Sequence, residues 1–60
     1  MVLDKENTKL LPDGWEMWTT GNKWQAMTKN ANEADPKTYT GVYRKDTDCV
    51  TAALQIVGST

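Results

Sequence analysis

The chain has 60 residues, with seven basic and eight acidic side chains and a net charge of −1. A chain of this length forms one domain and buries only about 60% of the surface that its unfolded form exposes. Its single cysteine, Cys49, cannot form an internal disulfide, and the absence of histidine removes the usual partner of cysteine in zinc sites. No apolar run approaches the roughly 20 residues of a membrane span, and an unpaired thiol is typical of a reducing compartment. We therefore expect a soluble cytoplasmic protein that has no metal or other cofactor.

The first predicted elements are a leader and a hairpin. Residues 1–10 carry alternating charges and are expected to form a flexible leader, after which residues 11–60 form a single βββα domain. Gly21-Asn22 is typical of a two-residue hairpin turn, and it predicts strands over about 15–20 and 23–29. Because side chains alternate across a strand, the hairpin has two predicted faces. The core face carries Trp15, Met17, Trp24 and Ala26, and the opposite face carries Glu16, Trp18, Lys23, Gln25, Met27 and Lys29.

The second half of the chain predicts a third strand and a helix. Residues 37–45, KTYTGVYRK, are rich in threonine and tyrosine and predict a strand, with a bulge or a close approach of the helix at Gly41. A helix is predicted over about 47–57, with Asp46 or Thr47 as its cap. Its expected buried stripe, at helical spacing, is Val50, Ala53, Leu54 and Val57. The predicted fold is therefore α+β, a three-stranded antiparallel sheet packed on one C-terminal helix.

The stretch LPDGWE, residues 11–16, resembles the opening of WW domains, which are small three-stranded modules that bind proline-rich peptides. This resemblance covers residues 11–21. The second strand of the family carries an aromatic pair and a histidine where this chain reads KWQAMTK, and the family's second tryptophan and closing proline have no counterpart here. We interpret the match as a common local solution, in which a turn is followed by a tryptophan, Trp15, that begins a strand and enters the core.

A second stretch, TYTGVYRKDTDCVTAAL at residues 38–54, resembles the third strand and helix of AP2-type and tyrosine-recombinase arm-binding domains. In these families a glycine and an aromatic residue end the last strand, and an alanine-rich helix backs the sheet; Gly41, Tyr43 and Ala52-Ala53 match that layout. The resemblance implies that the open face of the sheet enters the major groove of DNA. By position, the residues that would contact DNA are Trp18, Lys23, Gln25, Lys29, Tyr39 and Arg44. The sheet of these families is usually far more basic than the sheet predicted here.

Catalysis has little support in the sequence. Without histidine, a serine or cysteine nucleophile lacks its usual base, and Cys49 beside the apolar stripe is expected to be a buried packing residue. Glu33 and Asp35 lie in the loop NANEADP and are expected to be solvated charges. We therefore expect that the protein is not an enzyme.

Trp18 is the residue most suggestive of binding, because the alternation that buries its neighbours turns it outward. Two structural alternatives are that the leader covers it, with Leu10 and Leu11 folding over it, or that a bulge shifts the register. As an exposed anchor it would serve recognition, since aromatic residues and arginine dominate interface hot spots. The predicted partner is another protein or a second copy of the chain, with nucleic acid as the alternative that the resemblance implies. The predicted binding residues are Trp18, Lys23, Gln25, Met27, Lys29, Tyr39 and Arg44.

Overall fold

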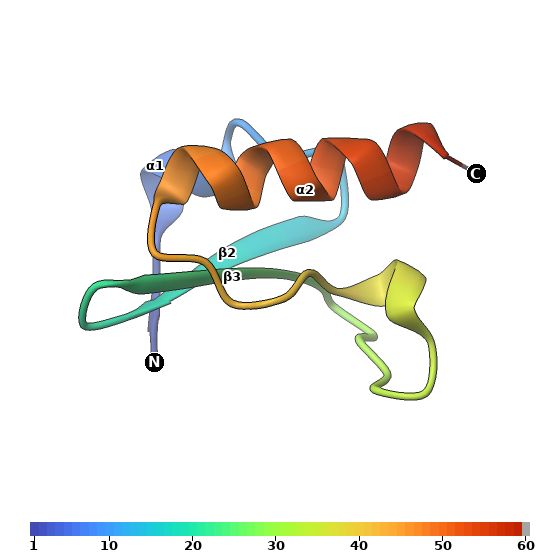
Figure 1. The fold of residues 1–60 in the computed structure, drawn as a ribbon, viewed down its shortest axis with the longest axis horizontal. Helices are drawn as coiled ribbons and strands as arrows, with labels where there is room; N and C mark the ends of the chain where they lie inside the picture. Colours follow the sequence, from blue (N-terminus) through green and yellow to red (C-terminus); the bar gives the residue numbers. More distant parts are fainter. Residues whose placement is uncertain (60) are drawn as a thin grey trace.

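The computed structural model describes residues 1–59 and has the predicted α+β fold, a three-stranded antiparallel sheet with one helix at the C-terminal end (Figure 1). Strand β2, Trp15–Thr20, and strand β3, Lys23–Thr28, form the predicted hairpin. Gly21 adopts a φ of 59°, a left-handed conformation that glycine reaches at no steric cost. The turn sets the register, which places Trp18 opposite Gln25 as alternation predicts.

The third strand of the sheet comes from the N-terminal residues. Strand β1, Val2–Leu3, pairs antiparallel with β2, so the strand order is β1-β2-β3. Helix α1, Lys5–Thr8, follows it and packs beside β2. The segment predicted as a leader thus carries two of the elements of the fold.

Backbone and side-chain hydrogen bonds attach this N-terminal segment. The Asp4 N–H donates to the Met17 carbonyl at 2.9 Å, and the Thr8 hydroxyl accepts from the Met17 N–H at 2.9 Å. The Asn7 side-chain amide donates to Asp4 Oδ2 at 2.7 Å and to Asp46 Oδ2 at 3.1 Å. Asn7 therefore links α1 to the start of the C-terminal helix, a long-range contact of a kind that no local pattern in the sequence predicts.

Residues 37–45 do not form the predicted strand. A short 3-10 helix, η1, covers Pro36–Thr38, and the rest of the segment runs beside β3 without regular pairing (Figure 1). Thr40 provides the physical reason, because its buried hydroxyl accepts the Ala26 N–H at 3.0 Å where a neighbouring strand would supply a carbonyl. Its own N–H donates to the Ala26 carbonyl at 2.8 Å. One threonine thus satisfies both backbone groups of Ala26 and interrupts the ladder.

Two isolated bridges hold the segment to β3, at Met27–Tyr39 and at Trp24–Tyr43. The segment takes four residue steps between the bridges and β3 takes three, so one extra residue bulges out around Gly41. The expected bulge is therefore present. The alternative prediction, a close approach of the helix at Gly41, does not apply, because a Cβ atom added at Gly41 would meet no atom within 4 Å.

Helix α2, Asp46–Gly58, covers the face of the hairpin that carries the predicted core residues (Figure 1). It begins one residue before and ends one residue after the predicted bounds. Lys45 occupies the N-cap position without a side-chain bond, so the predicted capping by Asp46 or Thr47 is wrong. Asp46 and Asp48 lie in the first turn, where carboxylates favour the positive end of the helix dipole.

The buried stripe of α2 differs from the predicted stripe. Cys49 and Ala53 are fully buried, and Val50 and Ile56 pack against the core beside them. Leu54 is 50% exposed and Val57 is 41% exposed, so these two predicted core residues face away from the sheet. The helix turns its small residues inward because the opposing surface is already filled by large side chains, namely Leu11, Trp15 and Met17.

Candidate functional site

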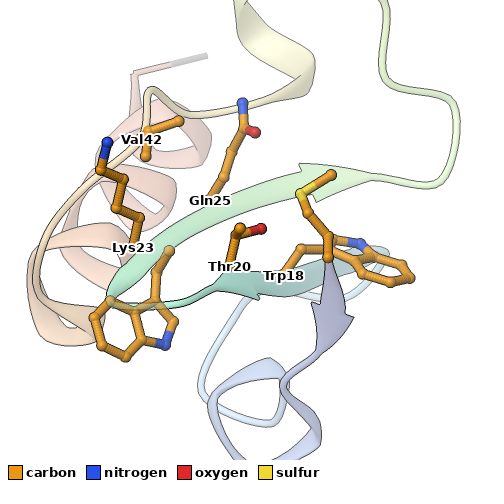
Figure 2. A pocket seen from close by; sticks show the side chains of 7 residues that line it. Trp18, Thr20, Lys23, Gln25 and Val42 are labelled. Carbon is orange, nitrogen blue, oxygen red and sulfur yellow. The ribbon is translucent and has the colours of Figure 1, made fainter.

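The face of the sheet opposite α2, called here the helix-free face, carries Glu16, Trp18, Thr20, Lys23, Gln25 and Met27 by strand alternation. A depression of about 290 Å³ opens on this face. In Figure 2, Lys23 and Val42 lie on one side of it and Trp18 on the other, with Thr20 and Gln25 between them. Met1 and Trp24 complete the lining. Two neighbouring strands therefore supply most of the depression, and the register of the hairpin fixes their spacing.

Trp18 lies in the middle strand of the sheet and is half-buried. Leu3 of β1 pairs beside it and Met1 lines the same depression, so these two residues are its neighbours from the N-terminal segment. Leu10 and Leu11 do not cover it, because Leu10 is exposed and Leu11 packs into the core cluster with Trp15. Trp18 thus keeps one accessible side on the helix-free face.

A second depression adjoins the first and shares Met1 and Gln25 with it. Met27, Tyr39 and Glu33 lie around it, together with Ala31. The Tyr39 hydroxyl donates to the Glu33 carbonyl at 3.0 Å, which orders the loop over residues 33–39 against β3. Met27 and Tyr39 are themselves bridged partners. Three of the predicted binding residues, Gln25, Met27 and Tyr39, therefore meet here.

Lys29 and Arg44, the other two predicted binding residues, line neither depression. Both are exposed. The bridge between Trp24 and Tyr43 places Arg44 at the level of Lys23, near the hairpin turn. Lys29 follows the last residue of β3, at the opposite end of the strand. The structure therefore separates the predicted basic residues into two positions and does not gather them into one patch.

Sequence reasoning missed several residues of this surface. Thr20 could have been found, because it alternates with Trp18 along β2. Met1 and Val42, which are 73% and 58% exposed, could not, because they belong to segments whose positions depend on β1 pairing and on the bulge at residues 40–41. Glu33 was interpreted only as a loop charge, and it rims the second depression.

Cys49 lies on the other side of the sheet, in the core. Burial away from solvent raises the pKa of its thiol, although the contact with the Thr40 hydroxyl at 3.5 Å opposes that shift. A thiol with a raised pKa carries little thiolate near neutral pH, and the thiolate is the nucleophilic form. Within residues 1–59 no group of three or more cysteine and carboxylate side chains is placed to hold a metal ion.

A further set of exposed apolar residues lies away from the helix-free face. Leu54 and Val57 project from α2, and Leu10 follows α1. Leu54 and Val57, called here the competing surface, offer another site for an apolar contact, and mutations can distinguish it from the helix-free face because the two share no residue. None of the helices in residues 1–59 is long and apolar enough to cross a membrane.

Comparisons with known proteins identify no relative of this chain. No protein-family model matches the chain, and neither a curated protein nor a solved structure matches it at a significant level.

Proposed function

We propose that the protein is a non-enzymatic cytoplasmic binding protein that contacts a protein partner or a second copy of itself through the helix-free face of its sheet. The observation that carries this proposal is the half-buried Trp18 in the centre of that face, with the exposed apolar side chains of Met1 and Val42 around the same depression. An aromatic ring that is partly desolvated and ringed by apolar atoms is the usual core of a protein interface.

Nucleic acid is the alternative ligand for the same face. Lys23 and Arg44 favour nucleic acid, because they lie at the same level near the hairpin turn and two cations there could neutralise two phosphates. Glu16 and Glu33 on the same face oppose it, because carboxylates repel the phosphate backbone. The balance of charge on the face supports a protein partner.

The experiment compares partner capture by the wild-type protein, by Trp18→Ala and by a control, Leu54→Ala, whose side chain lies on the competing surface. Each protein is immobilised and exposed to a lysate, after circular dichroism has shown that all three are folded. Partners that the wild type and the control retain, and that Trp18→Ala loses, fit the proposal. A folded Trp18→Ala protein that captures the same partners as the wild type contradicts it.

A parallel titration with duplex DNA separates the two ligand classes. Binding that is micromolar or tighter and that falls steeply with added salt would establish the nucleic-acid alternative, since each neutralised phosphate releases a counterion. No binding at low salt would remove that alternative.

A further inference from the structure

The helix-free face has opposite charges at its two ends. At the turn end, Lys23 pairs with Thr20 across the hairpin, and Arg44 lies level with it. At the far end, Glu16 pairs with Met27, and Glu33 rims the depression beside Met27. Lys29 beyond this end lowers its negative charge without reversing it, since two carboxylates remain against one ammonium group.

These charges are not used inside the molecule. Among residues 1–59, no ion pair joins Lys23, Arg44, Glu16 or Glu33 to another side chain. Lys23, Arg44 and Glu33 are exposed and Glu16 is half-buried. Their charges are therefore available to a molecule that docks on the face.

Trp18 and Gln25 lie midway between the two charged ends, because β2 and β3 pair with Trp18 opposite Gln25. Trp18 lies two residue steps from Glu16 in one direction and two from Thr20 in the other, and four residue steps of a strand span about 13 Å. Along the strands, the face therefore has a cationic end, an aromatic centre and an anionic end. A surface of this kind is complementary to itself after a half-turn.

We propose, resting on the function proposed above, that the partner of the helix-free face is a second copy of this chain, docked face to face about a two-fold axis. The axis runs across the strands at the level of Trp18 and Gln25, so the strand direction reverses between the copies. Lys23 of each copy then lies opposite Met27 of the other and one strand spacing, about 4.8 Å, to the side of Glu16, within reach of its long side chain. Arg44 comes level with Glu33, and the two Trp18 rings meet near the axis. Such an interface is isologous, and each ionic contact occurs twice.

The size of the face sets the strength of the dimer. The hairpin, β1 and residues 39–43 together cover an area about 20 Å long and about 19 Å wide, or about 400 Å² per copy, from the strand rise and spacing. Stable dimers bury about 800 Å² per copy, so this dimer belongs to the weak and transient class. We expect a micromolar dissociation constant that rises with salt, because the contacts at both ends are ionic and lie at the solvent-exposed rim.

The test exchanges charges between the two ends. In Lys23→Glu the altered side chain lies diagonally across from Glu16 of the other copy, and in Glu16→Lys it lies diagonally across from Lys23 of the other copy, so each variant alone repels itself twice. When the two variants are mixed, both contacts of the heterodimer join opposite charges. Lys9→Glu and Glu6→Lys carry the same charge changes at exposed positions, one at the end of α1 and one within it, and serve as controls.

Sedimentation equilibrium of the purified proteins, with native mass spectrometry of the mixture, gives the result. The proposal predicts a wild-type dimer, an at least tenfold weaker association for each face variant alone, controls like the wild type, and recovery of a heterodimer in the equimolar mixture. A mixture that stays monomeric while the wild type dimerises overturns the proposed docking. If either variant fails to fold, Arg44→Glu and Glu33→Lys form the second exchange pair.

Wild-type protein that stays monomeric at about 1 mM, well above the expected micromolar dissociation constant, also overturns the inference. That outcome leaves the proposed function standing, because partner capture from a lysate is measured separately. The reverse outcome, a dimer that ignores every substitution on the helix-free face, assigns self-association to another surface such as Leu54 and Val57.

Discussion

Replacing Leu54 with alanine tests the orientation of α2 against the sheet. The spacing of apolar residues predicts Leu54 in the buried stripe, where its loss would leave a cavity and cost about 2–5 kcal/mol. In the structure this side chain is 50% exposed, and the buried positions of the helix are Cys49 and Ala53. Burying a whole leucine side chain is worth about 1.5–3 kcal/mol, so losing the buried half should cost about 1 kcal/mol. No cavity forms, because the site opens to solvent.

Met17→Ala is the matched comparison. Met17 is completely buried under α2, and its truncation should cost about 2–5 kcal/mol. A 60-residue domain has a total stability of about 3–9 kcal/mol, so Met17→Ala should remove a large part of it. Leu54→Ala should lower the thermal midpoint by only about 4–8 °C for each kcal/mol lost.

Guanidinium unfolding of the three proteins, followed by tryptophan fluorescence, measures both costs. A loss of more than about 2 kcal/mol in Leu54→Ala, together with a loss below about 1 kcal/mol in Met17→Ala, would refute the helix orientation described here. In that case the stripe predicted from spacing would be the buried one.

Three further predictions concern the core and the polar contacts. Trp15→Ala should lower the free energy of unfolding by about 3–5 kcal/mol, and Trp18→Ala, at a half-buried position, should lower it by clearly less. Equal losses for the two variants, measured by urea unfolding, would place Trp18 in the core. Thr40→Val should cost about 1–3 kcal/mol, because it leaves the buried Ala26 N–H without its acceptor, whereas an unchanged thermal midpoint would show that the bond is not needed. Because burial raises the pKa of the Cys49 thiol above its ordinary value of 9.0, the folded protein keeps a proton that the unfolded chain releases. The free energy of unfolding should therefore fall as pH rises above 9.0 through the folded pKa, and Cys49→Ala should flatten that decline; parallel pH profiles of the two proteins would contradict the burial.

The hairpin could be predicted from the sequence because its determinants are local. Gly21-Asn22 fixes the turn, the turn fixes the register, and alternation then assigns Trp15 and Trp18 to opposite faces. The central part of the candidate site, Trp18 with Lys23 and Gln25, follows from the same three facts. No tertiary information is needed for them.

The third strand could not be predicted, because the competing segments differ in non-local contacts. Residues 37–45 have the composition of a strand, but the Thr40 side chain takes the Ala26 N–H and ends regular pairing. Val2–Leu3 has no strand signal beyond two apolar residues, and its place depends on bonds from Asp4 and Thr8 to Met17. Met1 and Val42, which lie in or beside these segments, escaped prediction for the same reason.

The orientation of α2 could not be predicted from the sequence either. Apolar residues occur at positions 49, 50, 52, 53, 54, 56 and 57, so the apolar surface of the helix is wider than one stripe. Spacing alone favours two overlapping stripes. Packing decides between them, because Cys49 and Ala53 are small enough to lie against Trp15 and Met17, which leaves Leu54 outside.

The central claim, that the helix-free face binds a second copy of the chain, is tested most directly by ¹H–¹⁵N NMR spectra of the wild-type protein over a dilution series. The series should run from about 1 mM to about 10 µM, a range that brackets the expected micromolar dissociation constant. The face-to-face arrangement predicts concentration-dependent shifts at the amides of Trp18, Lys23 and Gln25 and at both charged ends of the face, while the amides of Leu54 and Val57 stay constant. Shifts confined to Leu54, Val57 and Leu10, or spectra that do not change over the whole range, would contradict it.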